Sequence, residues 1–239
     1  MPGALELGLG LAPGLAWMIH IARKDDWERE PWRVVLAVFV LGVLSALLIA
    51  SCRPRVEALW PALDGEAGRW LDAFAITAFS EELAKLAAVS SGALWLSEWD
   101  EPMDGLVYGA AAGLGFAAME NAYWFATHGY SFDTLARSFT TMLGHACFTA
   151  GGAFLLGLAR LSGWRMAHVF GPLALATAVV PHGAYDFFLS GSRASGVVGL
   201  VVVLPGAVVL FALQVRWARV RSIAYHPRRG GVADVSPRR

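Results

Sequence analysis

The sequence predicts an all-α fold, a polytopic membrane helix bundle with about seven transmembrane helices. Of its 239 residues, 56% are hydrophobic and only 16% are charged, whereas soluble globular domains carry about 25% charged residues. Lysine plus arginine and aspartate plus glutamate each number 19, so the net charge is zero. This balance excludes a generally basic nucleic-acid-binding protein and an acidic disordered chain. The two cysteines are too few for a disulfide framework, and zinc-finger spacings are absent.

Seven apolar runs are long enough to be spans, since a transmembrane helix needs about 20 mostly apolar residues. The first run is followed, not preceded, by its basic residues, which is the reverse of a signal peptide. We therefore expect a single transmembrane domain over 1–217 and an Arg-rich disordered tail over 218–239, with a short interfacial helix within 53–69. The predicted spans cover 5–21, 32–51, 70–96, 104–127, 138–160, 165–190 and 197–217.

The lysines and arginines predict the orientation of the chain. With the N-terminus outside, the inner loops and the tail hold 13 of them and the outer loops hold five, Arg137 among the latter. Because cytoplasmic loops carry the excess of basic residues, we expect an outside N-terminus and a cytoplasmic C-terminus. The chain is thus predicted to be an integral protein of a bacterial-type plasma membrane.

Several ionisable residues lie inside the predicted spans, where a charge costs about 2.5–3.5 kcal/mol on translocon scales. At about 1.5 Å per helical residue, the polar groups of four spans fall at a similar depth in the outer half of the membrane. They are Glu81, Glu82 and Lys85 in the third span, Glu120 and Asn121 in the fourth, His145 in the fifth, and His182 and Asp186 in the sixth.

The spacing of these residues predicts local pairs. Lys85 follows Glu82 by three residues and Glu81 by four, so its ammonium can reach either carboxylate. Asp186 follows His182 by four residues and could fix the tautomer of its ring. Two interpretations are open: polar contacts that hold a bundle together, or a functional site. The number of charged groups at one level favours a site.

Small residues dominate the fourth span. Gly109, Gly113 and Gly115 stand among alanines. Such a pattern is typical of helices that pack closely against one another in membranes. We therefore interpret these glycines as packing positions.

Taken together, the motifs resemble the PrsW family of intramembrane proteases. Glu81-Glu82-x-x-Lys85 is similar to its E-E-x-x-K signature, and the stretch 104–116, which runs on to Glu120-Asn121, resembles its second motif. His145 and His182-x-x-x-Asp186 are similar to its two histidine motifs. The four motifs occur in order, each on its own predicted span, and the resemblance covers about 70–189.

The resemblance implies a membrane endopeptidase, distantly related to the CAAX prenyl endopeptidases. Members of the family cut single-pass substrates, such as anti-sigma factors, near the outer membrane surface. Although the family carries a metalloprotease label, its relatives are better described as glutamate-type hydrolases. Two histidines and a glutamate could supply three zinc ligands, but Lys85 beside the glutamates disfavours a dication. We therefore favour an enzyme without a cofactor, with zinc as the alternative.

The hypothesis that follows is hydrolysis by an activated water. Glu81 is the expected general base, with Glu82 as the second choice. His182, oriented by Asp186, and His145 would stabilise the oxyanion or protonate the leaving amine. Lys85 would balance the charge of the glutamates, and Glu120 and Asn121 would complete the cavity. The alternatives are a proton-coupled transporter or ion relay, which also uses intramembrane charges, and a non-catalytic membrane scaffold.

Overall fold

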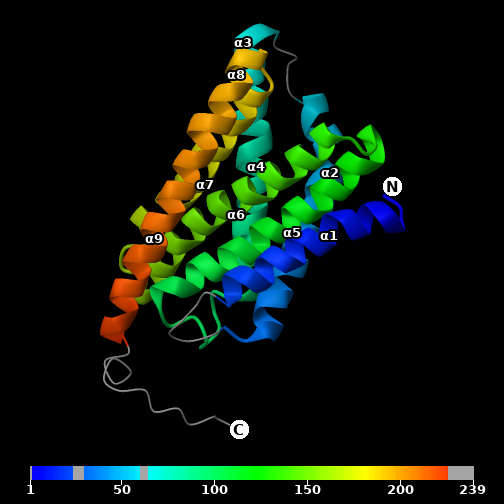
Figure 1. Ribbon diagram of the computed structural model, residues 1–239. Helices are drawn as coiled ribbons and strands as arrows, with labels where there is room; N and C mark the ends of the chain where they lie inside the picture. The colour runs from blue at the N-terminus through cyan, green and yellow to red at the C-terminus, as the bar shows by residue number, and fades with distance from the viewer. Residues whose placement is uncertain (1, 24–29, 60–63, 226–239) are drawn as a thin grey trace.

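The computed structural model describes residues 2–23, 30–59 and 64–225, and these residues form helices and no strand. Two long helices run side by side through the middle of the bundle (Figure 1). The predicted all-α fold is confirmed. The central pair is α5 (Pro102–His128) and α6 (Phe132–Leu161); α1 (Ala4–Ala22) and α2 (Trp32–Leu59) pack on α5, and α7 (Ala167–Leu189) and α9 (Leu204–Tyr225) on α6.

Helix α5 is buried on nearly all sides, because its glycines and alanines let the backbones of its neighbours approach closely. A Cβ atom added at Gly113 would lie 2.3 Å from the carbonyl oxygen of His145, and one at Gly115 would lie 2.0 Å from that of Phe39. Real side chains do not tolerate such distances. The predicted packing role is thus confirmed at both glycines, and the first of these contacts seats the His145 backbone directly against α5.

The third predicted span, 70–96, lies on a continuous helical segment that begins at Gly65, has a wider middle and already ends at Gly92. It consists of α3 (Gly65–Trp70), a π-helical stretch η1 (Leu71–Ala78) and α4 (Phe79–Gly92). The hydroxyl of Ser80 donates to the carbonyl of Thr77 at 3.2 Å, just where the π-helical stretch ends. π-Helical turns widen a helix locally and occur often at functional sites, and this stretch directly precedes the turn of α4 that carries Glu81 and Glu82.

Two features shape the C-terminal half. Helix α7 contains Pro172 and Pro181, and a proline inside a helix removes a hydrogen bond and bends it. The second proline directly precedes His182, so the helical turn before this histidine lacks one backbone hydrogen bond. The chain then continues through α8 (Arg193–Val198) and a π-helical stretch η2 (Gly199–Val203) into α9.

Helices α2 and α9 extend beyond their predicted C-terminal ends. Helix α2 continues through Pro54 to Leu59, so the polar segment after the second span is largely an extension of that helix; α3 follows, and 60–63 lie outside the described residues. Helix α9 continues to Tyr225, so 218–225 are helical and not a disordered tail, while 226–239 lie outside the described residues.

By length and composition, four helical segments of the described residues could cross a membrane. They are Ala4–Ala22, Trp32–Leu59, Phe132–Leu161 and Arg193–Arg221. The structure therefore supports an integral membrane protein, and the count of about seven spans stays a prediction.

Candidate active site

The polar residues predicted for four separate spans meet in one network. Glu81, Glu82 and Lys85 project from α4, Glu120 and Asn121 from α5, His145 from α6, and His182 and Asp186 from α7. Helices α4, α5, α6 and α7 all contact one another or share these side chains (Figure 1). These residues therefore converge in the structure as the sequence predicts, whereas their catalytic roles stay predictions.

Glu82 is the centre of the network and is fully buried. One of its oxygens, Oε1, lies 2.8 Å from Lys85 Nζ and 2.8 Å from His182 Nδ1. The other, Oε2, accepts a hydrogen bond from Thr149 Oγ1 at 2.9 Å. A buried carboxylate is tolerated only where its oxygens are paired, and both are paired here. Glu82 therefore holds Lys85 and His182 in fixed positions.

Glu81 differs from Glu82 because its side chain reaches a cavity. Its Oε2 lies 3.2 Å from Lys85 Nζ and 3.8 Å from His182 Nε2, and the residue lines a cavity of about 350 Å³. One face of this carboxylate is held by an ammonium group, and another faces space that can admit water. The arrangement favours Glu81 over Glu82 as the group that can exchange a proton with a ligand.

The two histidines have different hydrogen-bond partners. Lys85 Nζ lies 2.8 Å from His145 Nδ1, and Glu120 Oε2 lies 2.8 Å from His145 Nε2. An ammonium group can only donate, so we assign the proton of the neutral ring to Nε2. His182 faces carboxylates at both nitrogens, with Asp186 Oδ2 3.3 Å from Nε2 on the cavity side. The predicted His182–Asp186 contact is confirmed.

Arg137 closes the network on α6, although the sequence predicts it in an outer loop and not in the site. Its guanidinium donates to Glu120 Oε1 at 2.6 Å and to Asn121 Oδ1 at 3.3 Å, and it lies 3.8 Å above the ring of Trp124. Asn121 Nδ2 in turn donates to the carbonyl of Ser138 at 3.0 Å. Arg137 precedes His145 by eight residues, about two helical turns, and this spacing could have revealed that both lie on one face.

The cavity separates the predicted residues into two groups. Glu81, Glu120, His145, His182 and Asp186 line it, whereas Glu82, Lys85 and Asn121 lie behind its wall. Further lining residues, which no sequence motif marks, include Arg53, Thr141, Phe148, Tyr185 and Ser190. Tyr185 Oη donates to Thr140 Oγ1 at 3.1 Å, so it belongs to the wall between α6 and α7.

Three of the lining residues could be considered as metal ligands. Glu81, His145 and His182 offer ligand atoms that lie within 4.8 Å of one another, and two histidines with one glutamate form a known set of zinc ligands. The Lys85 ammonium, however, lies 3.2 Å from Glu81 and 2.8 Å from His145. A divalent cation between these ligands would meet a positive charge at hydrogen-bond distance. The residues as arranged therefore do not fit a zinc ion.

Comparisons with known proteins agree with the motifs. Residues 30–214 match the model of the PrsW family, described as intramembrane metalloproteases. The chain is 30% identical over 184 residues to Protease PrsW of Bacillus subtilis (strain 168), covering 77% of this chain and 82% of the relative. It is 29% identical over 220 residues to Protease PrsW of Geobacillus kaustophilus (strain HTA426), covering 91% and 90%. No solved structure matches significantly. These matches favour a protease over a transporter or a scaffold.

Proposed function

The chain belongs to the PrsW family of intramembrane proteases, and we propose that it cleaves membrane-anchored proteins near the outer leaflet by means of a water activated by Glu81. The observation that carries this proposal is the difference between the two adjacent glutamates. Glu82 has both oxygens paired within the protein, whereas Glu81 lies at the edge of a cavity beside His182.

In the first step Glu81 accepts a proton from a water in the cavity. The water oxygen then forms a bond to the carbonyl carbon of the substrate, and the electron pair of the carbonyl double bond moves onto its oxygen. Lys85, 3.2 Å from Glu81, places a positive charge beside this carboxylate. General-base catalysis of this kind contributes about 10²–10⁴ to the rate.

His182 acts on the oxyanion and the leaving group. The protonated ring stabilises the negative charge on the tetrahedral intermediate. As the C–N bond breaks, its electron pair goes to the amine nitrogen, which takes the proton from His182. Glu81 then returns its proton to His182, whose Nε2 lies 3.8 Å from the Glu81 carboxylate. Asp186, at 3.3 Å from the same nitrogen, orients the ring throughout.

The remaining residues act through these two. Glu82 fixes the direction of His182 at 2.8 Å, and His145 holds Lys85 from its other side. Glu120 receives the Nε2–H of His145 at 2.8 Å, and Asn121 joins α5 to α6 behind it. We assign them positioning roles. The mechanism is of the glutamate type, and no step passes through a metal ion.

The proposed substrate is the transmembrane region of a single-pass protein, such as an anti-sigma factor. The cavity lies near one end of the bundle, because it is lined by Arg53 toward the end of α2 and by Ser190 just after α7. Its wall contains charged and aromatic side chains, which suit the boundary between lipid and water. With the predicted orientation of the chain, this end faces outward.

The test is cleavage of a fluorescent single-pass substrate by the purified full chain in detergent. Glu81→Gln should lower kcat by about 10²–10⁴ with little change in thermal stability. The control is Glu66→Gln, because the Glu66 side chain is 87% exposed and outside the cavity. If Glu81→Gln cleaves like the control, Glu81 is not the base; if Glu82→Gln and His182→Ala are equally active, the whole site is wrong.

A further inference from the structure

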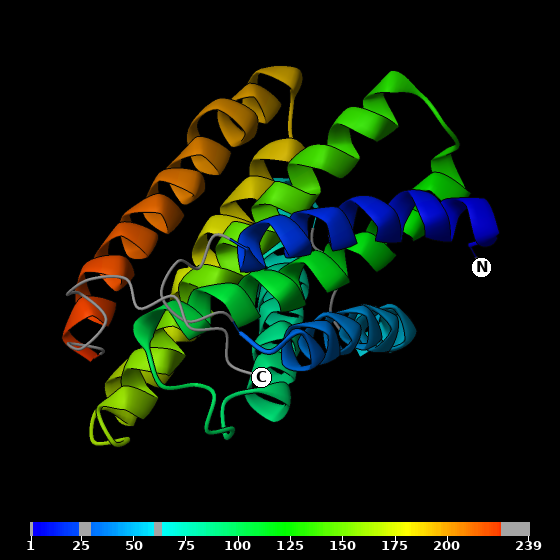
Figure 2. The ribbon, with the colours of Figure 1, turned by 60° about the horizontal axis from the view of Figure 1, so that its bottom comes forward.

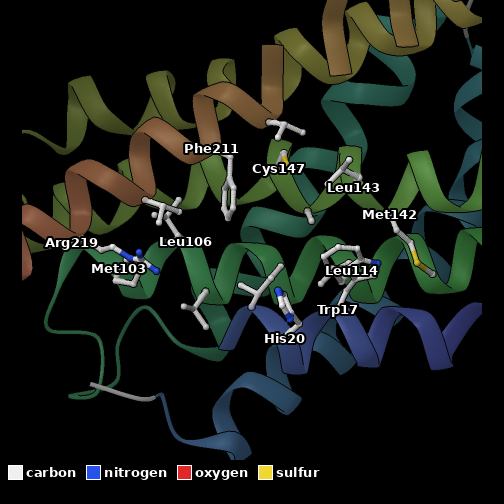
Figure 3. A pocket seen from close by; sticks show the side chains of 15 residues that line it. Trp17, His20, Met103, Leu106, Leu114, Met142, Leu143, Cys147, Phe211 and Arg219 are labelled. Carbon is white, nitrogen blue, oxygen red and sulfur yellow. The ribbon is translucent and has the colours of Figure 1, made fainter. Parts of the chain in front are cut away.

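A second cavity, the apolar groove, lies on a different face of α6 from the polar cavity. It has a volume of about 320 Å³ and is bounded by α1, α5, α6 and α9 (Figure 3). Its lining includes Trp17, Leu106, Leu143, Cys147, Phe211 and Arg219. None of the residues of the polar cavity lines it. The groove therefore requires an explanation separate from the proteolytic site.

The groove is elongated along α9. Val208, Phe211, Val215 and Arg219 line it at intervals of three or four residues, so they share one face of the helix. At 1.5 Å per residue this face is about 16 Å long. Figure 3 shows Arg219 and Met103 at one end of the groove and Met142 at the other. A long apolar channel thus ends at a guanidinium group.

The apolar lining limits what can fill the groove. Water is a poor occupant, since it needs polar partners that an apolar lining does not supply. An empty groove would leave its lining without van der Waals partners. A single hydrocarbon chain supplies such partners along the face of α9 and needs no polar ones.

The basic residue at the end of the groove favours a hydrocarbon chain that carries an anionic head group. His20 and Arg219 are the basic side chains of the lining, and Arg219 lies at its end. A guanidinium binds phosphate through paired hydrogen bonds. Arg219 lies near the C-terminal end of α9, where Arg221 stacks on Trp217 at 5.2 Å in the manner of residues at a membrane boundary.

We propose that the apolar groove binds one acyl chain of an anionic phospholipid whose phosphate lies on Arg219. This inference does not depend on the proposed proteolytic mechanism. It assigns to α1 and α9 a shared role, because the bound chain fills the space between them over the surface of α5 and α6. In Figure 2 these two helices lie on either side of that surface.

The first test uses native mass spectrometry of the full chain extracted from vesicles with equal amounts of phosphatidylglycerol and phosphatidylcholine. Phosphatidylglycerol should be retained preferentially, and Arg219→Gln should reduce its retention about fivefold. Arg221→Gln is the matched control, because it removes the same charge from the same end of α9 outside the groove. Equal retention of both lipids, or equal losses in both variants, would overturn the proposal.

The second test examines the acyl chain. Val208→Trp should fill the groove and abolish retention, whereas Val209→Trp, at a position 57% exposed, should not. A phosphatidylglycerol with a photoreactive group in its acyl chain should label the groove residues of α5, α6 and α9 in the unmodified chain. This measurement stands even if a variant fails to fold. Labels spread evenly around the bundle, or a free fatty acid or a peptide recovered from the groove, would overturn the assignment.

Discussion

The polar cavity and the apolar groove are nearly equal in size, about 350 and 320 Å³, yet their linings are opposite in character. Helix α6 contributes to both, with His145 in the polar cavity and its neighbour Ala146 in the apolar groove. A rotation of about 100° between successive helical residues is enough to separate them. One helix can therefore support a charged site and an apolar groove because each uses a different face.

The two cavities also differ in the partners that their side chains need. Buried charges of the polar cavity are tolerated because each has a partner, as Glu82 and Lys85 do at 2.8 Å. The side chains of the apolar groove need no such partners. We therefore expect substitutions behind the polar cavity to destabilise the protein far more than comparable substitutions in the groove.

The largest effect is expected for Lys85→Met. This change leaves the buried Glu82 without its ammonium partner, and breaking a buried ion pair costs about 3–5 kcal/mol. Cys147→Ala in the apolar groove should cost about 1 kcal/mol, because little volume is lost. Unfolding of the purified proteins in micelles measures both. A double variant with Glu82→Gln should recover part of the loss, and equal stabilities of Lys85→Met and Cys147→Ala would refute the comparison.

A smaller effect is expected for Gly113→Ala, at the contact between α5 and α6. The added Cβ would lie 2.3 Å from the carbonyl oxygen of His145, and overpacking of this kind costs about 1–3 kcal/mol. Because His145 would shift with its backbone, activity should fall as well. Gly206→Ala in α9 is the control, since nothing lies within 4 Å of its Cβ position, and it should be neutral or stabilising.

Arg137 should affect activity more than stability. Arg137→Gln removes the 2.6 Å contact with Glu120, which holds His145. We expect kcat to fall about tenfold with an unchanged melting temperature and partial recovery in Arg137→Lys. Arg193→Gln is the control, because Arg193 is exposed on α8 and lies outside the cavity. A fall in stability that Lys does not restore would indicate a structural role only.

The sequence predicted the polar cavity well because charges in apolar runs are rare and costly. Each of Glu81, Glu120, His145 and His182 could be selected on its own span for that reason. Arg137 was missed because the span containing His145 was expected to begin at 138, whereas α6 begins at Phe132. A charge just outside an expected boundary is attributed to a loop.

The apolar groove could not be predicted from the sequence. Its lining residues, such as Leu106, Leu143 and Val208, have the same chemistry as the lipid-facing residues around them. Whether an apolar side chain borders a groove depends on how α1 and α9 are spaced over α5 and α6, and hydropathy carries no information on that spacing. The length of α9 was underestimated for a related reason. Its arginines end the apolar run, but the helix continues to Tyr225.

The smallest effect is expected from chelators, and it concerns the polar cavity alone. Lys85 lies between Glu81 and His145 and excludes a dication, so incubation with a zinc chelator should leave the activity of the wild type unchanged. If Lys85 is what excludes the ion, the Lys85→Gln variant should bind zinc that the wild type does not bind. Metal analysis after dialysis measures this difference. Wild-type protein that loses activity with its zinc and regains it on zinc addition would contradict the glutamate mechanism. In that case Lys85 must move away from Glu81 and His145 when the metal binds, because the ammonium and the ion compete for the same two ligands.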